Sequence, residues 1–331
     1  MKSVFVNRWL LVPLFLFVAF PVFAKPPQAV GTCPFTIDQP GKYRLTNDLV
    51  NCDGFGVAIH ASDVTLDLKG HTISCENTGS LSAGVEAGMA VPVHGVKITN
   101  GTVTGCAGGI LLGFAEDSSV TKVTASGNYY VDSEAFSGLG IFVLGGGNNV
   151  IMHNTTYDNE KYGISSLWSS SNLYKHNTSH NNRGIDGGFG ISLDEDSNSQ
   201  VLCNRVYGNP DGIYLGPGSN DNLLRGNLVV DNSFSGIGMM GLAWNGFEFF
   251  SVDIPGGNLV RSNIVEGNGV YDLFEFHLDL ATWEFLLHPE GKCMNTWVKN
   301  QFGPDTRGPD GCFGTPVMLD DDDVCALDDD D

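Results

Sequence analysis

The chain has 331 residues, 42% of them hydrophobic, with eight cysteines and a formal net charge of −21. This negative charge argues against binding to nucleic acid phosphates or anionic membrane surfaces, because both require basic patches. Neutral glycans, cationic partners and anions bridged by Ca²⁺ remain as partner classes.

The first 24 residues are arranged as a secretory signal peptide. Lys2 and Arg8 precede an apolar run from Trp9 to Phe23, and Ala24 marks the expected cleavage site. No later stretch approaches the roughly 20 apolar residues that span a bilayer. We therefore expect a secreted or periplasmic protein without a membrane span after signal removal, and a retained N-terminal anchor is the alternative.

All eight cysteines follow this segment, as expected for disulfides formed in an oxidising compartment. Eight cysteines allow many pairings, and the sequence alone does not choose among them. We predict the disulfides Cys33–Cys52, Cys75–Cys106 and Cys293–Cys312, and assign no partner to Cys203 or Cys325.

Two phrases recur at a shared period near the low twenties, with occasional lengthening, which marks a solenoid with loop insertions. The first is a Gly-Ile strand phrase, with its glycines at Gly109, Gly140, Gly163, Gly190, Gly212 and Gly236. The second is a pair of asparagines five residues apart, found as Asn154/Asn159, Asn177/Asn182, Asn204/Asn209, Asn227/Asn232, Asn263/Asn268 and Asn295/Asn300.

Each repeat contains short apolar runs such as "GIYL" and "NLVV", separated by Gly, Asn, Asp and Ser. These are strand signals bounded by turn signals, without a sustained helical period. The dense leucine consensus of leucine-rich repeats is absent. The pattern predicts an all-β fold, a parallel β-helix, in which equivalent asparagines stack about 4.8 Å apart and satisfy turn backbone.

The chain resembles the secreted right-handed parallel β-helix proteins of the pectate-lyase-like superfamily over about residues 31–313. Within it, the chain is most similar to the branch of periplasmic copper-protein-maturation β-helix proteins and alginate C5-epimerases. The resemblance implies the fold more firmly than an activity, because one fold hosts many chemistries. The residues that carry it are "CPFTIDQPGKYRLTNDLVNC", "DVTLDLKGHTI", "VKITNGTVTGC", "CMNTWVKNQFG" and the two repeated phrases.

This similarity leads us to expect a signal peptide followed by a capped right-handed solenoid, as a monomer. The expected segments are a signal peptide (1–24), an N-terminal cap (25–54), the β-helix (55–275), a C-terminal rung and cap (276–313) and an acidic tail (314–331).

The phrase "GFGISLDED" (188–196) is the one Gly-Ile copy that continues into three consecutive acids. Side chains alternate along a strand, so with Ile191 and Leu193 in the core, Asp194 is predicted on the outer face. Tyr214 should lie one coil further on, and Asp211 in the turn before its strand.

Four residues are therefore the predicted catalytic group. Asp194 or Asp211 would act as acid–base residue, Arg183 as a clamp for a sugar carboxylate, and Tyr214 as proton donor or stacking platform. Two insertions, 127–138 and 241–257, border this face and should build its walls. The predicted substrate-binding residues are Lys161, Asp186, Trp168, Tyr130 and Trp244.

The acids Asp194, Glu195 and Asp196 also suggest a Ca²⁺ site, because Ca²⁺ prefers oxygen ligands. Two carboxylates that flank a glycosidic bond could instead hydrolyse it. The plainer alternative for Glu195 and Asp196 is a solvated turn in an acidic protein. The runs Asp320–Asp323 and Asp328–Asp331 lack the spacing of a Ca²⁺ loop and are predicted to be a tail.

His153, His176 and Cys203 precede ladder asparagines on successive coils. Alternation predicts that they point inward, where they could bind copper or zinc, or serve as core histidines bonded to the asparagines.

The sequence thus favours a carbohydrate-active protein that acts on a polysaccharide in a groove along one sheet, as lyase, epimerase or glycosidase. The alternatives are a non-catalytic glycan-binding or structural β-helix and a periplasmic metal-handling protein. The epimerases' Asp-Pro-His-Asp signature and the polygalacturonases' paired aspartates and Gly-His-Gly are absent, so no catalytic residue is assigned by motif.

Overall fold

The structure is a computed structural model, and the predicted signal peptide, Asp186 and most of the acidic tail lie outside the residues it describes. Within the described part, no helix has the length and apolar character needed to cross a bilayer. The described residues are 26–76, 82–131, 136–184, 188–244, 249–251, 255–279, 284–286, 293–308, 311–319 and 325.

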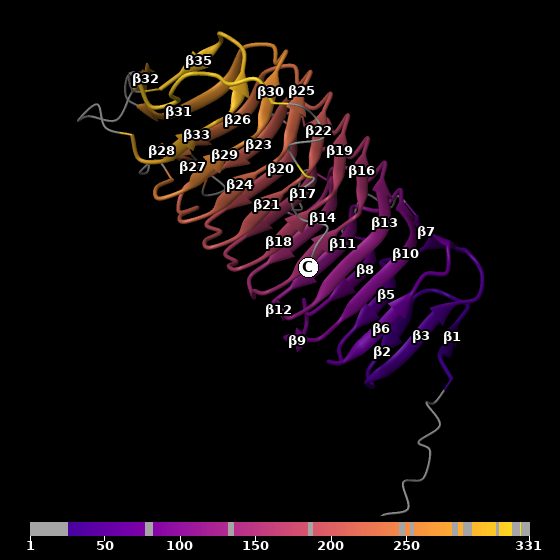
Figure 1. Cartoon of the computed structure of the whole chain (residues 1–331). Coiled ribbons are helices and arrows are strands. Elements are labelled where there is room, and N and C mark those ends of the chain that lie inside the picture. Colours follow the sequence, from indigo (N-terminus) through magenta and orange to yellow (C-terminus); the bar gives the residue numbers. More distant parts are fainter. Residues whose placement is uncertain are drawn as a thin grey trace, which may run out of the picture.

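The described chain winds into a stack of coils (Figure 1), and most coils add a strand to a 12-stranded sheet, here termed the front sheet. Its neighbouring strands pair in parallel from β2 to β31. The front-sheet strands are β2 (Phe35–Ile37), β5 (Phe55–Ile59), β8 (Ala83–Ala87), β11 (Gly108–Gly113), β14 (Leu139–Leu144), β17 (Tyr162–Leu167), β20 (Phe189–Asp194), β23 (Asp211–Leu215), β26 (Ser235–Met240), β31 (Tyr271–Asp279), β32 (Glu284–Leu286) and β35 (Thr306–Arg307).

The rest of each coil forms a 19-stranded back sheet, so the predicted all-β parallel β-helix is confirmed. Its strands are β1 (Gln28–Val30), β3 (Gly41–Leu45), β4 (Leu49–Cys52), β6 (Val64–Asp67), β7 (Thr72–Cys75), β10 (Lys97–Thr104), β13 (Ser119–Ser126), β15 (Val150–Met152), β16 (Thr155–Tyr157), β18 (Leu173–Lys175), β19 (Thr178–His180), β21 (Gln200–Leu202), β22 (Arg205–Tyr207), β24 (Leu223–Arg225), β25 (Leu228–Val230), β29 (Leu259–Arg261), β30 (Ile264–Glu266), β33 (Thr296–Val298) and β34 (Gln301–Phe302).

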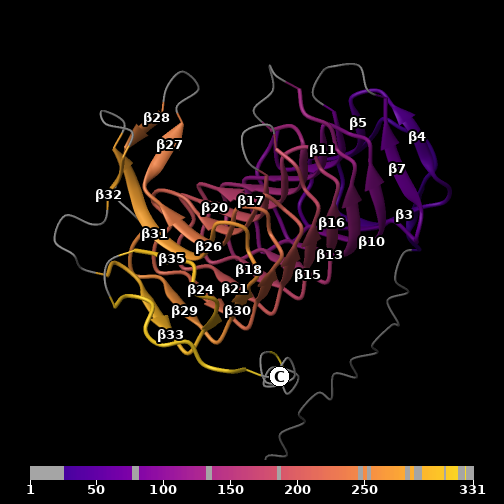
Figure 2. The same ribbon diagram turned by 90° about the horizontal axis from the view of Figure 1, so that it is seen from above.

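Two small two-stranded sheets complete the described fold: β9 (Val93–His94) with β12 (Ala115–Glu116), and β27 (Leu242–Trp244) with β28 (Phe249–Ser251). The pair β27–β28 is antiparallel, and Figure 2 shows it standing out at the C-terminal end of the stack. The buried aliphatic side chains of both sheets form one continuous core between them.

The asparagine ladders are present and hold successive coils together. Asn204 shows the pattern: its Nδ2 donates to the Tyr174 carbonyl at 2.8 Å and to Asn227 Oδ1 at 3.0 Å. A third ladder, which includes Asn172 and Asn222, was missed in the sequence. The last predicted pair does not occupy the predicted ladders. Asn295 bonds to Asn258 in the third ladder, and Asn300 bonds to Asn263 in the ladder that contains Asn204.

Asn204→Ala is expected to lower the free energy of unfolding by about 3 kcal/mol, because several buried polar groups lose their partners. Denaturant unfolding followed by circular dichroism measures the change. Arg205→Ala is the matched control, since Arg205 is the next residue and its side chain is exposed. Equal stability of the two variants would show that the ladder adds no stability.

The prediction that His153, His176 and Cys203 point inward is wrong. Each has a left-handed backbone, with φ of 57°, 52° and 54°. This conformation interrupts the alternation, so that the following asparagine faces the core and the residue itself faces outward. The two histidine rings stack on the outer surface with centroids 5.1 Å apart, and Cys203 forms a disulfide.

Four disulfides link the described cysteines. The predicted pairs Cys33–Cys52, Cys75–Cys106 and Cys293–Cys312 are confirmed. The two cysteines left without a partner pair with each other, and Cys203–Cys325 fastens the C-terminal segment to the back sheet. Four disulfides are typical of proteins that fold in an oxidising compartment.

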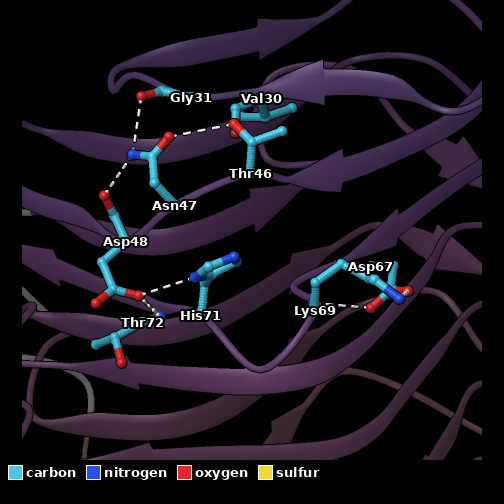
Figure 3. Close-up of polar contacts among 9 residues, drawn as sticks. All are labelled: Val30, Gly31, Thr46, Asn47, Asp48, Asp67, Lys69, His71 and Thr72. Carbon is cyan, nitrogen blue, oxygen red and sulfur yellow. Dashed lines mark hydrogen bonds and ion pairs between the residues drawn. The ribbon is translucent and has the colours of Figure 1, made fainter.

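Polar side chains tie the first coils together at the N-terminal end (Figure 3). Asn47 Nδ2 donates to the carbonyls of Gly31 at 3.1 Å and Asp48 at 2.8 Å. Asp48 Oδ1 in turn accepts from the Thr72 backbone at 3.0 Å and contacts His71 Nδ1 at 3.1 Å. The bond from Thr72 and the contact with His71 lower the pKa of Asp48.

Candidate functional site

The outer face of the front sheet from β14 to β31, termed the outer wall, is shaped by an irregularity in each strand. An added Cβ on Gly190 would lie 2.2 Å from Val206 Cγ1 and 2.8 Å from Asn209 Nδ2, so this glycine faces the core. Ile191 faces the core as well. Two consecutive inward residues turn Phe189 outward, and the glycine of the repeated phrase is required for this packing.

The predicted neighbours "SLDED" and "DGIYLG" do lie on adjacent coils. β20 pairs with β23 in parallel, with Ser192 opposite Tyr214. Asp194 follows two residues after Ser192 and is partly exposed on the wall. Its Oδ1 would be 1.9 Å from an added Cβ on Gly216, so the acid leans toward the next coil and the missing side chain there makes room for it.

A row of aromatic rings begins at the starts of β17 and β20 and ends at Tyr214, on the coil next to Asp194. The ring centroids of Tyr162 and Phe189 are 5.1 Å apart, and those of Phe189 and Tyr214 are 4.5 Å apart. Lys161 Nζ lies 5.2 Å from the centroid of Tyr162 and 5.6 Å from that of Tyr130. The predicted binding residues Lys161 and Tyr130 therefore meet at the start of this row.

Asp194 has the electrostatics of an acid–base residue. Burial raises the pKa of Asp194 to about 6, although the bond from Ser192 opposes the shift. Ser192 Oγ donates to Asp194 Oδ2 at 2.7 Å. A carboxyl with a pKa near neutrality exchanges protons readily under physiological conditions.

The pKa values of Asp211 and Tyr214 are also raised. Burial raises the pKa of Asp211 to about 6, and Ser235 donates a hydrogen bond to its Oδ1. Burial, together with the charge of Asp194, raises the pKa of Tyr214, so this phenol stays protonated. Tyr214 is 6% exposed, and its hydroxyl donates to the Met240 carbonyl at 3.5 Å.

Asp194 and Asp211, the two carboxyls with raised pKa values, are too far apart to form a catalytic pair. Asp211 is opposite Phe189, at the start of the strand that ends in Asp194. Five residues along a strand separate their positions by about 15 Å. The acid and base of glycosidases are within roughly 10 Å of each other. The geometry therefore does not support hydrolysis by Asp194 and Asp211 together.

The acids Asp194, Glu195 and Asp196 do not converge on one ion. Glu195 is exposed with φ of 46°, and this left-handed residue turns Asp196 into the core. Asp196 Oδ2 accepts from Ser169 at 2.7 Å and from Tyr174 at 3.3 Å. The solvated-turn interpretation is wrong for Asp196. Among the described residues, no three His, Cys, Asp or Glu side chains are placed to hold a metal.

Of the remaining predicted site residues, the structure describes two side chains, those of Arg183 and Trp168, and they lie at the two edges of the wall. Arg183 is exposed on the turn before β20, where its backbone donates to the Asn159 carbonyl at 2.8 Å. Trp168 is exposed at the opposite edge. Asp186 and the side chain of Trp244 lie outside the described residues.

Sequence reasoning missed a cluster of titratable side chains at the N-terminal end of the front sheet. His60 lies between two carboxylates, with Nε2 3.2 Å from Glu86 Oε1 and Nδ1 3.4 Å from Asp38 Oδ1. Glu86 is 3% exposed, and burial raises the pKa of this residue against the effect of His60. The sequence contains one indication of this cluster, because Glu86 is the single charged residue in the apolar strand phrase "AGVEA".

Replacing Asp194 and Asp211, the two carboxyls with raised pKa values, should stabilise the fold by an amount that depends on pH. Asp194 and Asp211 keep their protons up to about pH 6 when folded, against an ordinary pKa of 3.8. Between these two pKa values the folded chain holds protons that the unfolded chain has released. The free energy of unfolding of the wild type therefore falls as the pH rises from about 4 to about 6. The variant with both residues changed to Asn should match the wild type near pH 4 and exceed it by about 2 kcal/mol at pH 7.

Denaturant unfolding of both proteins across this pH range measures the difference. A stability difference that stays constant with pH would contradict the raised pKa values.

A family model described as the right-handed β-helix region matches residues 45–183 and 133–275. The chain belongs to the right-handed β-helix family. Its parallel sheets and stacked coils are those of this fold, which confirms the architecture expected from the sequence. No curated protein matches the chain in sequence.

Several solved β-helices resemble this family member. The A-module of mannuronan C-5 epimerase AlgE4 from Azotobacter vinelandii has a TM-score of 0.56 and 13% identity, over 88% of this chain and 88% of that one. The periplasmic alginate epimerase AlgG has a TM-score of 0.53 and 18% identity, over 85% and 66%. The Dettilon tailspike protein gp208 has a TM-score of 0.55 and 15% identity, over 85% and 58%. At these identities the likeness shows the fold alone.

Proposed function

We propose that this protein is a carbohydrate-active β-helix protein that takes a polysaccharide along the outer wall, with Asp194 as its acid–base residue. The observation that carries the proposal is the position of Asp194. It is a partly exposed carboxyl with a pKa raised to about 6, one coil away from Tyr214, the last ring of the aromatic row. Aromatic side chains with a few polar groups among them are the usual lining of ligand sites.

Each neighbouring group has a role in this proposal. Asp194 takes a proton from the sugar or returns one to it, and Ser192 holds the carboxylate in place. Tyr162 and Phe189 offer ring surface to the sugar chain. Lys161 supplies a positive charge, and it lowers the pKa of Asp194 slightly against the effect of burial. Asp211 is too far along the strand to be a second catalytic carboxyl.

Secretion is part of the proposal. Four disulfides are typical of proteins in an oxidising compartment, and the basic and apolar start of the chain fits export. Extracellular or periplasmic polysaccharides are the substrates available there. Two of the similar β-helices are named as epimerases of mannuronan and alginate, which makes polysaccharides the first ligand class to test.

Purified protein incubated with a panel of polysaccharides, with and without Ca²⁺, tests this function. Absorbance of unsaturated uronates would indicate a lyase, new reducing ends a glycosidase, and altered sugar NMR signals without cleavage an epimerase. Products from at least one polysaccharide are expected. Neither products nor retention on any member of the panel would contradict the proposal.

A non-catalytic glycan-binding protein is the second candidate. It is favoured by the 6% exposure of Tyr214, whose hydroxyl faces the Met240 carbonyl rather than solvent. In this case a polysaccharide slows the protein in affinity electrophoresis, but no product forms after prolonged incubation. The two candidates differ only in the product assay.

A further inference from the structure

One edge of the front sheet carries a stack of residues with left-handed backbone, in the turns that follow β11, β14, β17 and β20. The backbone N–H of Trp168 donates to the Asp194 carbonyl at 3.2 Å, so the edge lies directly beside the proposed acid–base residue. Four successive coils place Phe114, Gly145, Trp168 and Glu195 here, with φ of 47°, 64°, 56° and 46°.

Two of these positions carry large aromatic side chains that remain in solvent. Phe114 is 48% exposed and Trp168 is 58% exposed. Glycine adopts left-handed backbone without strain and is present at Gly145, whereas a bulky residue in this region is an outlier. Burial of the rings does not offset the strain. Neither packing nor backbone conformation calls for an aromatic ring at these turns, where the neighbouring coils carry Gly145 and Glu195, and a ligand that covers both rings would account for them.

The spacing of the two rings suits a long ligand. Phe114 leans over Gly145, because a Cβ on that glycine would be 2.8 Å from Phe114 Cδ1. Phe114 and Trp168 are two coils apart, which is about 9.6 Å along the stack. Asp194 is one coil beyond Trp168. A chain molecule that follows the stack would cover both rings and then reach the carboxyl.

The charges along this edge limit what that chain can be. Its exposed charged residues in these turns are all acidic: Glu116, Asp117 and Glu195. An anionic polysaccharide would be repelled, whereas the CH groups of a sugar ring are attracted to the negative face of an aromatic ring. The four turns, which contain neither Lys nor Arg, are 113–118, 145–149, 168–172 and 195–199.

We propose that Phe114 and Trp168 are stacking platforms for a polysaccharide without acidic groups, which runs along this edge toward Asp194. The inference rests on the proposed function and narrows its substrate class. Uronate polymers would need cations where this edge has carboxylates. Of the outcomes named for the polysaccharide panel, we therefore expect retention or new reducing ends, and not the uronate products of a lyase or an epimerase.

Affinity electrophoresis with neutral polysaccharides, and with the carboxymethyl derivative of each one retained, tests the inference. The variants are Phe114→Gly and Trp168→Gly, since glycine keeps the left-handed turn that Gly145 already shows. Phe234→Ala is the matched control, because Phe234 is 41% exposed but precedes β26 at the opposite edge. We expect retention by a neutral polymer only, weakened at least about fivefold in each glycine variant and unchanged in the control.

Thermal unfolding should show both glycine variants as stable as the wild type, so that lost retention is not lost folding. Stronger retention by a carboxymethyl derivative, or undiminished retention of the glycine variants, would overturn the inference and leave the proposed function standing. Self-association of the wild type that Trp168→Gly abolishes in sedimentation would assign the edge to a second copy of the chain and overturn it too. No retention of the wild type by any polymer would overturn both proposals.

Discussion

Asp194→Asn is expected to reduce turnover of the polysaccharide by at least about 100-fold, because general acid–base groups contribute that much or more. The same change should raise the free energy of unfolding at pH 7 by about 1 kcal/mol, since it removes a charge that is costly to bury. The cause is visible in the structure, where burial raises the pKa of Asp194 to about 6. Steady-state kinetics and thermal unfolding of the same preparations give both values.

Asp211→Asn is the matched control for this experiment. Asp211 has the same raised pKa of about 6 and a similar hydroxyl partner, but it begins its strand at the far end of the wall. It should gain similar stability without the loss of turnover. Wild-type turnover in Asp194→Asn, or equal losses in the two variants, would remove Asp194 from the mechanism.

Asp196→Ala should lower the free energy of unfolding by about 4 kcal/mol, because it leaves buried hydroxyl groups without an acceptor. Ser169 and Tyr174 donate to one oxygen of Asp196, and Ser199 donates to the other. Asp196→Asn keeps one oxygen and should lose about half as much. Denaturant unfolding at constant pH measures both variants.

Glu195→Ala serves as the control, since Glu195 is the adjacent acid and is exposed to solvent. A change within about 0.5 kcal/mol is expected for it. If Asp196→Ala were as stable as Glu195→Ala, the buried network around Asp196 would have no part in holding the coils together.

The period of the sequence predicted the fold well, because the repeat itself is the structural unit. Equivalent asparagines such as Asn177 and Asn204 had to fall on neighbouring coils once the repeat length was known. The outward position of Asp194 followed from simple alternation after Ile191 and Leu193, and both of these are fully buried. Disulfides between cysteines close in sequence, such as Cys33–Cys52, were also predicted correctly.

Alternation failed wherever one residue adopts left-handed backbone. His153 and Cys203 face outward, and Glu195 sends Asp196 into the core, because such a residue shifts the inward and outward positions by one. The sequence gives little sign of this, since the position accepts His, Cys and Glu as well as glycine. The inward-facing Gly190 beside Ile191 is a similar break, visible only from packing.

Distances between side chains on neighbouring coils could not be predicted from the sequence either. Asp211 and Asp194 are near each other in sequence and on adjacent coils, yet they lie at opposite ends of their strands. His60 and Glu86 are 26 residues apart and form a close contact. Distances of this kind depend on the pairing of strands and on side-chain direction, which composition and spacing do not determine.

An NMR titration of the Asp194 carboxyl carbon, with and without the polysaccharide that the protein retains, shows whether Asp194 is an acid–base residue inside a glycan site. We expect a pKa near 6 in the free protein, assigned by comparison with Asp194→Asn, and a further change when bound sugar excludes water from the wall. A pKa close to the ordinary 3.8 that bound polysaccharide leaves unchanged would show that Asp194 is an ordinary surface carboxylate outside any glycan site.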